Sequence, residues 1–464
     1  MKDNEINRRL RELPAVHELA EELRSEIPDA APAAVREACR KTLEIERKRI
    51  LDGGVSTSAE ELKKHSVIEH RCLTSSSMKN VINATGVILH TAIGRACLPE
   101  RSIEEVYRVA KGYSVLQWDE ETGRRGHRDI HTEKLICELT GSEAATIANN
   151  NAGATLLVLS ALARGREVIV SRGQLVEIGG SFRIPEVMKQ SGAHMREVGC
   201  TNRTHLRDYR EAVNENTAVI LRVHPSNYRI RGFTGEVPLE ELVKLGREYE
   251  IPVVDDLGAG SYVDLKYFGL PSEPTVRSSI EAGAAVVTSS GDKLIGGPQA
   301  GIISGQRKYI DMIKKHPLAR ALRVGKLTIA ALEAALVLFR EDPEYLIANH
   351  PLYRMFAMEK IELKKNADEF VSMLELPDSC SATVIETDSY VGSGALPDHA
   401  IPSWGAAISC PDTELLARGL RLGSPAVASR IEDSLLKLDM RTLQPGEAEE
   451  LAVLINKLTG ELWA

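Results

Sequence analysis

A single lysine, Lys293, stands within a stretch of small residues that reads TSSGDKLIGGPQAG (288–301). The preceding EAGAAVVTSS predicts a buried strand that ends on Ser290, three positions before the lysine. Three glycines keep its surroundings small: Gly291, Gly296 and Gly297. Partial desolvation at such a strand end lowers a lysine pKa, and a neutral amine is what a Schiff base with an aldehyde cofactor requires. The Ser290 hydroxyl could then contact a phosphate; the alternative is a lysine on an ordinary turn.

A second buried strand ends on two carboxylates, Asp255 and Asp256, in VVDDLGAG (253–260). A carboxylate at a strand end can pair with a protonated pyridine nitrogen and keep pyridoxal phosphate (PLP) a strong electron sink. The alternatives are an N-cap for the next segment and a magnesium ligand.

A third stretch, IANNNAGATLLVLSAL (147–162), places polar and small residues directly before an apolar helix. The first-turn amides of such a helix bind phosphate through free N–H groups and the helix dipole. The residues that leave room for the anion are Asn149, Asn150, Asn151, Ala152, Gly153 and Ala154. Simple capping by asparagine is the alternative. The order of phosphate loop, aspartate, then lysine predicts a PLP enzyme with its cofactor at the carboxyl edge of a sheet.

Arginines form a further group. Arg95 lies in HTAIGRA, and Arg320 and Arg323 lie three apart in HPLARALRVGK, on one face if that segment is helical. The stretch GRRGHRD (123–129) adds arginines beside glycines. Guanidinium groups bind phosphate-like oxyanions, although solvated surface arginines are the more common case.

Alternating strand and helix patterns must position these groups. EVIVS (167–171), TAVILRVH (217–224), IPVVDDL (251–257), AAVVTSS (284–290) and AGIIS (300–304) predict buried strands, several of them separated by helical patterns. This alternation indicates a mostly parallel, doubly wound α/β sheet, in which ligands bind at the carboxyl ends of the strands. We expect three domains: a helical domain over 1–75, a large catalytic domain over 76–345 and a small α/β domain over 346–464. Long helices are expected at 326–342 and 353–375.

Composition limits the class of protein. The 464 residues are 43% hydrophobic and 27% charged, with a net charge of −8, so any contact with nucleic acid must be local. Seven cysteines are scattered, without CxxC spacing, which indicates reduced thiols and neither a disulfide framework nor a metal site. No signal peptide or run long enough to span a bilayer is found. We therefore expect a cytoplasmic protein that does not contact a membrane.

Several strings resemble one family, the bacterial selenocysteine synthases, or L-seryl-tRNA(Sec) selenium transferases. They include VINATGVILHTAIGRA, NNNAGA, VSRGQLVEIGGSFRIPEVM, HPSNY, DLGAGSYVDL, SGDKLIGGPQAGII and HPLARALR. The resemblance runs through residues 81–325, and LRELPAVHELAEEL resembles the family's N-terminal domain. It implies a PLP-dependent transferase of fold type I, the aspartate aminotransferase class, with a mostly parallel seven-stranded sheet and helices on both faces.

The resemblance also implies roles for residues. Lys293 would be the PLP lysine with Asp292 beside it, and Asp256 rather than Asp255 would pair with the pyridine nitrogen. Ser290 and the loop at Asn150, Asn151, Ala152 and Gly153 would hold the cofactor phosphate. Arg95, Arg320 and Arg323 would receive selenophosphate. The implied reaction converts L-seryl-tRNA(Sec) to L-selenocysteinyl-tRNA(Sec) through an aminoacrylyl ester, with Lys293 taking the Cα proton.

The RNA partner must contact the chain somewhere. Arg36, Arg40 and Arg47 are spaced by four and seven, which puts them on one face of a predicted helix. A solvated helix face explains this spacing equally well. The resemblance implies that the N-terminal domain binds tRNA(Sec) and that dimers assemble into a ring, a decamer, so that one tRNA bridges subunits.

Two other functions compete with this interpretation. One is a PLP-dependent lyase, of the ammonia lyase type, acting on a small amino acid or amino sugar acid. Such an enzyme has no need of the N-terminal 75 residues. The other is a tRNA-binding protein without catalysis, which the intact Lys293, Asp256 and Ser290 disfavour. The role of Arg430 stays open.

Overall fold

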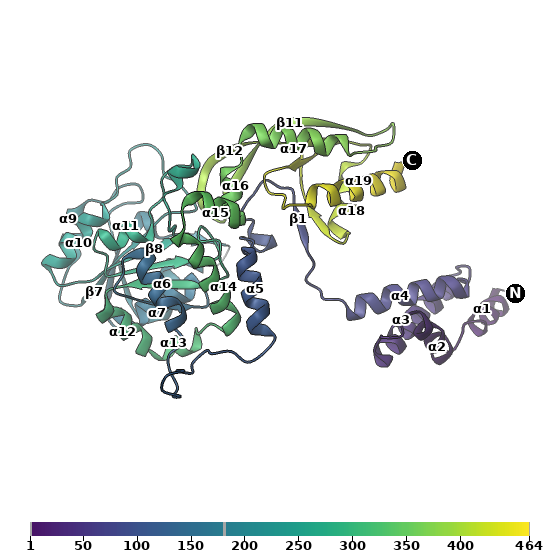
Figure 1. The fold of residues 1–464 in the computed structure, drawn as a ribbon, viewed down its shortest axis with the longest axis horizontal. Coiled ribbons are helices and arrows are strands. Elements are labelled where there is room, and N and C mark those ends of the chain that lie inside the picture. The colour runs from purple at the N-terminus through teal and green to yellow at the C-terminus, as the bar shows by residue number, and fades with distance from the viewer. Residues whose placement is uncertain (1, 180–181, 464) are drawn as a thin grey trace. The chain divides into compact units, whose positions relative to one another are not determined.

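The chain divides into two compact units, Met1–Asn80 and Val81–Ala464. The computed structural model describes residues 2–179 and 182–463 (Figure 1). The first unit has the predicted helices: α1 (Lys2–Arg11), α2 (Val16–Glu26), α3 (Pro32–Leu51) and α4 (Ala59–Thr74). Its core joins Leu19 and Leu23 of α2 to Val35 and Leu43 of α3. Helix α4 starts at the expected cap, where the Ser58 side chain accepts a hydrogen bond from the amide of Glu61.

A seven-stranded sheet forms the centre of the second unit (Figure 1). The strand order is β2-β10-β9-β8-β7-β3-β6, and β10 alone runs antiparallel to its neighbours. This confirms the predicted mostly parallel α/β sheet. The bounds are β2 (Ala144–Ala148), β3 (Glu167–Ser171), β6 (His194–Val198), β7 (Thr217–Val223), β8 (Val253–Gly258), β9 (Val286–Ser290) and β10 (Gly301–Gly305).

Alternate residues of these strands point into different cores, as strand geometry requires. Val219 and Leu221 of β7 belong to one cluster, whereas Ile220 between them belongs to another on the opposite face. Helices therefore cover both faces of the sheet. Because both faces are buried, β-branched residues are favoured at successive positions of the strands. The helices along this part of the chain are α5 (Glu100–Ala110), α6 (Ile130–Thr140), α7 (Asn151–Ala163), α8 (Ile184–Ser191), α9 (Leu206–Ala212), α10 (Leu239–Glu248), α11 (Val276–Glu281), α12 (Arg307–Lys315), α13 (Pro317–Ala321) and α14 (Lys326–Val337). A short hairpin, β4 (Glu177–Ile178) and β5 (Phe182–Arg183), precedes α8.

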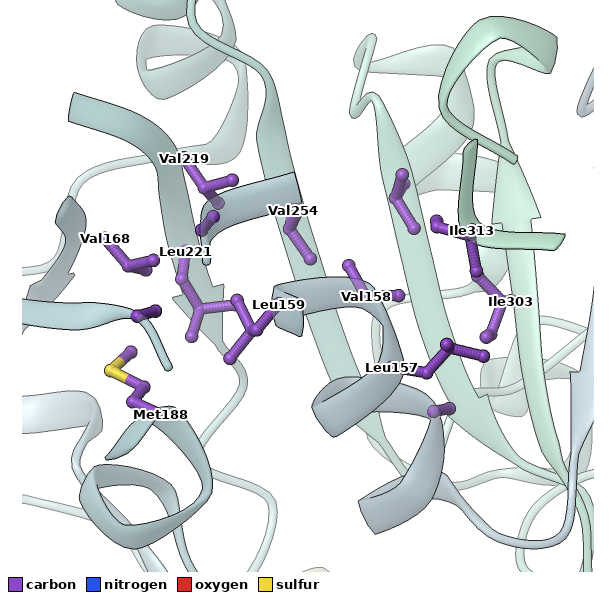
Figure 2. Packing of buried hydrophobic residues seen from close by; sticks show 14 of the residues in the cluster. Leu157, Val158, Leu159, Val168, Met188, Val219, Leu221, Val254, Ile303 and Ile313 are labelled. Carbon is purple, nitrogen blue, oxygen red and sulfur yellow. The ribbon is translucent and has the colours of Figure 1, made fainter. Parts of the chain in front are cut away.

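Helix α7 is apolar on all sides because it is enclosed between the sheet and neighbouring helices. Figure 2 shows Leu159 beside Leu221 of β7 and Leu157 beside Ile303 of β10. The helix follows β2 after two residues, so this packing fixes its N-terminus at the carboxyl end of that strand.

The C-terminal part is built on an antiparallel sheet of order β11-β12-β15-β14. Its elements are β11 (Ser381–Gly392), β12 (Ala395–Ser409), β14 (Arg430–Glu432), β15 (Leu435–Asp439), α17 (Lys360–Ser372), α18 (Thr413–Leu422) and α19 (Glu447–Trp463). Strand β1 (Val81–Asn83) pairs in parallel with β13 (Ala426–Ala428). The start of the expected catalytic domain is thus joined to the expected small domain, and the contacts unite 81–464 in one unit.

The helices expected at 326–342 and 353–375 are both interrupted. Helix α14 ends at Val337 and is followed by the short helices η4 (Leu338–Arg340) and α15 (Pro343–Asn349). The second pattern divides into α16 (Pro351–Ala357) and α17. At this second break the Arg441 guanidinium donates to the carbonyl oxygens of Met355 and Met358, so it supplies a donor to these acceptors at the end of α16. Within the described residues, no helix is both long and apolar enough to cross a membrane.

Candidate active site

Most of the residues predicted to bind the cofactor or to act in catalysis gather around one cavity of about 270 Å³ at the carboxyl edge of the sheet. It is lined by Arg95, Asn150, Asn151, Ala152, Asp256, Ser290, Asp292 and Lys293, together with residues considered below. Gly153 lies one position further along α7 and lines an adjacent cavity. The order of motifs along the chain therefore predicted a real cluster in space.

Lys293 is only 7% exposed. Burial lowers the pKa of its ammonium group, and the nearby positive charge of Arg95 lowers it further, while Asp292 and Asp256 act in the opposite direction. Burial is the largest of these effects, so the amine loses its proton more readily than an exposed lysine does. Ser290, at the end of β9, is also buried and lines the same cavity.

Two buried donors hold the segment that follows the lysine. The Tyr353 hydroxyl donates to the carbonyl oxygen of Leu294 at 2.6 Å. The Nε2 atom of His350 lies 3.1 Å from the carbonyl oxygen of Ile295. Burial lowers the pKa of His350 to about 4, so its imidazole is neutral and donates through Nε2. Both side chains are at most 1% exposed. Helix α16 and its cap thus fix the backbone directly after Lys293.

The glycines near Lys293 do not act as the sequence suggested. A Cβ atom on Gly296 would lie 2.2 Å from Cε1 of His350, and one on Gly291 would lie 2.7 Å from the carbonyl oxygen of Pro298. They allow the lysine segment to fold against itself and against His350. The glycines that line the cavity are Gly179 and Gly258.

The two aspartates of β8 face opposite sides of the sheet, as successive strand residues must. Asp255 accepts hydrogen bonds from Arg222 and Ser279, away from the cavity. Asp256 lines the cavity and accepts from Asn151 Nδ2 at 2.8 Å and from the Thr155 hydroxyl at 2.9 Å. These two donors fix the orientation of the Asp256 side chain in the cavity wall.

The loop at the start of α7 is shaped for an anion. Asn150 caps the helix, its Oδ1 accepting from the amide of Gly153 at 2.8 Å. The amides of Asn151 and Ala152 precede the first intrahelical hydrogen bond and stay available to a ligand. Gly301 of the neighbouring strand lets this loop approach, because a Cβ there would lie 2.1 Å from the Asn150 carbonyl oxygen.

Arg95 reaches the lysine from a distant part of the chain. Its Nη1 lies 2.5 Å from Oδ2 of Asp292. Its backbone is in the left-handed region, at φ 64, directly after Gly94 at φ 98. A non-glycine residue held in this conformation is common at functional sites. Arg95 is therefore part of the Lys293 cavity, as expected.

Arg320 and Arg323 are not part of it, which corrects the expected grouping of three arginines. They are exposed and line a separate cavity of about 770 Å³ together with Arg125 and Arg128. Helix α13 ends at Ala321, so the two side chains are not on one helix. Leu322 between them packs against the phosphate loop, its carbonyl oxygen accepting from the Asn149 amide at 2.9 Å.

The sequence interpretation missed further residues of the cavity, above all His224 and Ser226 after β7, and Gln299. It also missed Thr155 beneath Asp256. The motif HPSNY contained the first two, but only the sheet shows that β7 ends next to β8. Arg430 bonds to Thr387 in the C-terminal sheet and does not line the cavity.

Arg36, Arg40 and Arg47 are all exposed on α3. Arg40 pairs with Glu37 on the same helix. Val35, Cys39 and Leu43 lie on a neighbouring face of α3 and belong to the core of the first unit. The three arginines are thus accessible to a partner.

Comparisons with known proteins agree with the family that the sequence motifs resemble. The family model described as "L-seryl-tRNA selenium transferase" matches residues 81–444. The L-seryl-tRNA(Sec) selenium transferase of Caldanaerobacter subterraneus subsp. tengcongensis is 45% identical over 456 residues, covering 97% of this chain and 98% of its own. That of Geobacter sulfurreducens is 49% identical over 390 residues, covering 83% and 84%.

Among solved structures, a D-glucosaminate-6-phosphate ammonia-lyase matches with a TM-score of 0.57 and 21% identity, covering 83% of this chain and 96% of that one. At this identity the likeness shows the fold alone. The family match extends over most of the chain, and it confirms the family that the motifs resemble. The chain belongs to the L-seryl-tRNA selenium transferase family, a family of PLP-dependent enzymes.

Proposed function

We propose that this chain converts L-seryl-tRNA(Sec) to L-selenocysteinyl-tRNA(Sec) with selenophosphate as the selenium donor, in selenocysteine biosynthesis. The observation that carries the proposal is the buried Lys293 in one cavity with Asp256, the start of α7 and Arg95. A relative named for this activity aligns with 97% of the chain, so the alignment extends over most of the N-terminal unit. The ammonia-lyase counterpart leaves 17% of the chain unmatched (100% less the 83% covered), which favours the transferase.

The cavity fits PLP. A poorly solvated amine, Lys293, can bond the aldehyde carbon, and the Asp256 carboxylate can receive the pyridine N–H. The amides at the start of α7 and the Ser290 hydroxyl can bind the phosphate. A buried Asn151 Oδ1 atom has no hydrogen-bond partner among the described residues, as expected for a site built to receive a ligand. Bound PLP supplies an electron sink for negative charge at the seryl Cα.

The chain's own groups then have distinct tasks. Lys293 takes the Cα proton on its Nζ atom, and Asp256, held by Asn151 and Thr155, keeps its negative charge in place. Arg95 binds the oxyanion of selenophosphate, with Asp292 fixing the guanidinium. The seryl carboxylate is esterified to tRNA, so this site needs no arginine to clamp it. Arg430, which could have been such a clamp, is engaged elsewhere.

Arg320 and Arg323 remain candidates for selenophosphate binding on one condition. Because they line a different cavity within one chain, a second copy must bring them to Lys293. We therefore propose a homo-oligomer built from dimers, in which two chains contribute residues to each active site. The expected decameric ring is one such assembly of dimers. A test is to mix Lys293→Ala and Arg320→Ala chains: shared sites predict activity in the mixture that neither variant has alone.

The N-terminal unit is proposed to bind tRNA(Sec), with Arg36, Arg40 and Arg47 as contacts. Replacing all three by glutamine should weaken tRNA binding and reduce its salt dependence, without changing PLP binding. Fluorescence anisotropy with labelled tRNA(Sec) measures this. The cytoplasmic location stays a prediction from the scattered cysteines, all of them free.

The central test compares the PLP-loaded parent with Lys293→Ala. Both receive seryl-tRNA(Sec) plus selenophosphate and, separately, a panel of free amino acids and amino sugar acids. Selenocysteinyl-tRNA(Sec) formed by the parent and lost in the variant supports the proposal. Turnover of a free small molecule with seryl-tRNA(Sec) untouched would refute it in favour of a lyase.

A further inference from the structure

His224 is an imidazole in the wall of the Lys293 cavity for which the reaction above has no use. It directly follows β7, and its backbone amide donates to the carbonyl oxygen of Asp256 at 2.8 Å. The residue lines the Lys293 cavity and also a second cavity behind it, which includes Arg222 and Glu236. Its position at the carboxyl edge, next to the strand that carries Asp256, is where ligands of such sheets bind.

Glu273 orients this imidazole. The Nε2 atom of His224 lies 2.8 Å from Oε2 of Glu273, and the two side chains are 19% and 8% exposed. A carboxylate only accepts, so Nε2 carries a proton, and Nδ1 is the atom that gains or loses the second one. Among the described residues, none makes a hydrogen bond with Nδ1. A buried carboxylate also stabilises the imidazolium, as in other carboxylate–histidine pairs.

The remaining charged groups of the cavity are less suited to donate a proton. Asp256 and Asp292 are carboxylates held by hydrogen-bond donors or by Arg95. Lys293 is occupied with the Cα proton, and a guanidinium does not give up its proton in proteins. On the outer side Arg229 is 4.0 Å from Glu273 and is 46% exposed. His224 is thus the side chain of this cavity whose ring nitrogen is best placed to hand a proton to a ligand.

We propose that His224, oriented by Glu273, donates the proton with which the seryl β-hydroxyl leaves. This inference rests on the proposed function. Lys293 takes the Cα proton, the electron pair of the Cα–H bond forms the Cα–Cβ double bond, and the Cβ–O bond breaks with its pair on oxygen. The oxygen takes the Nδ1 proton of His224 and departs as water. The net change is loss of one water from the seryl group, and His224 regains its proton from solvent.

The test uses a leaving group that needs no proton. The PLP-loaded parent and His224→Asn are compared on seryl-tRNA(Sec) and on β-chloroalanyl-tRNA(Sec), each with selenophosphate. General acid catalysis contributes about 10²–10⁴ in rate, so kcat on the seryl substrate should fall by about 100-fold or more. With the chloro substrate, which releases chloride, kcat should stay within about threefold of the parent. Added imidazole should partly restore the seryl reaction of His224→Gly.

Two further variants separate orientation from general damage. Glu273→Gln keeps the shape but not the charge, and should slow only the seryl reaction. Arg229→Gln, the matched control, touches the same carboxylate from the outside and should leave both reactions unchanged. PLP affinity, measured by equilibrium dialysis, should be the same in the parent, His224→Asn, Glu273→Gln and Arg229→Gln.

Equal losses of His224→Asn on both substrates, or a fall in its PLP affinity that accounts for the loss, would overturn the assignment. So would full activity of His224→Asn on seryl-tRNA(Sec), while leaving the proposed function intact. A parent that never converts seryl-tRNA(Sec) would refute the proposed function, and this inference with it.

Discussion

Replacing Gly296 by alanine tests how the lysine segment is held. Gly296 has φ 67, and an added Cβ would lie 2.2 Å from Cε1 and 2.7 Å from Nε2 of His350. His350 cannot easily move, since it is 1% exposed and bonded to the carbonyl oxygen of Ile295. The left-handed backbone costs about 1–2 kcal/mol for a residue with a Cβ. Overpacking adds about 1–3 kcal/mol, which gives a total loss of about 2–5 kcal/mol.

Urea unfolding of the apo-protein measures this loss, and a double-mutant cycle separates its two parts. In Gly296→Ala with His350→Ala the steric part disappears, while the backbone part remains. The coupling energy should therefore be about 1–3 kcal/mol in the stabilising direction. Gly112→Ala is the matched control: no atom lies within 4 Å of its added Cβ, and its φ is outside the left-handed range. We expect it to change stability by no more than about 0.5 kcal/mol.

Unfolding of Gly296→Ala at the urea concentration of the parent, or additivity of the two substitutions, would contradict this prediction. Additivity would mean that the loop relaxes away from His350 at little cost. The visible absorption of the PLP-loaded protein gives a second readout, because displacement of the segment should also disturb Lys293. Loss of stability with unchanged absorption would show that the lysine does not depend on this packing.

Three other predictions follow from buried charges. Burial lowers the pKa of Lys293, so the unfolded state holds the proton more tightly than the folded state does. The stability of the apo-protein therefore rises with pH between the folded-state pKa and 10.5. In urea melts Lys293→Met should be more stable than the parent at pH 7, by a margin that shrinks toward pH 10. A constant margin would contradict this. Arg95→Gln should raise the Lys293 pKa, since a lowering charge is lost and Asp292 is freed; pH-dependent acetylation followed by mass spectrometry measures it, and an unchanged or lower pKa would count against the pairing. Arg441→Met should cost about 3 kcal/mol or more in unfolding free energy, because the carbonyl oxygens of Met355, Met358 and Pro402, the first of them buried, lose their donor. A loss below about 1 kcal/mol would mean that water replaces the guanidinium.

The central strands and the main site residues could be predicted from the sequence because their patterns are local. Buried β-branched runs predict β7, β8 and β9, and polar residues at their ends mark the carboxyl edge. In the sequence, only the family resemblance indicates that Asp256 rather than Asp255 faces the cofactor. In the structure, strand alternation places the two side chains on opposite sides of the sheet.

Other features depend on contacts between distant segments. Strand β6 was missed because HMREV is an exposed edge strand with polar side chains. The pairing of His224 with Glu273 spans 49 residues, and Glu273 lies in a loop without a motif. The separation of Arg320 from Lys293 depends on where α13 ends. No spacing along the chain contains this information.

Helix α16 links two regions by direct contacts. The Tyr353 hydroxyl on this helix donates to the carbonyl oxygen of Leu294, just after Lys293. At the other end, the Met355 carbonyl oxygen accepts a hydrogen bond from Arg441, and Arg354 donates to Gln444 at 2.6 Å. The seven residues of α16 thus connect the lysine segment with the end of β15 in the C-terminal sheet. Any rotation of that sheet on substrate entry would pull directly on the backbone beside Lys293. Closure of the C-terminal part and positioning of the catalytic amine would then be a single mechanical event.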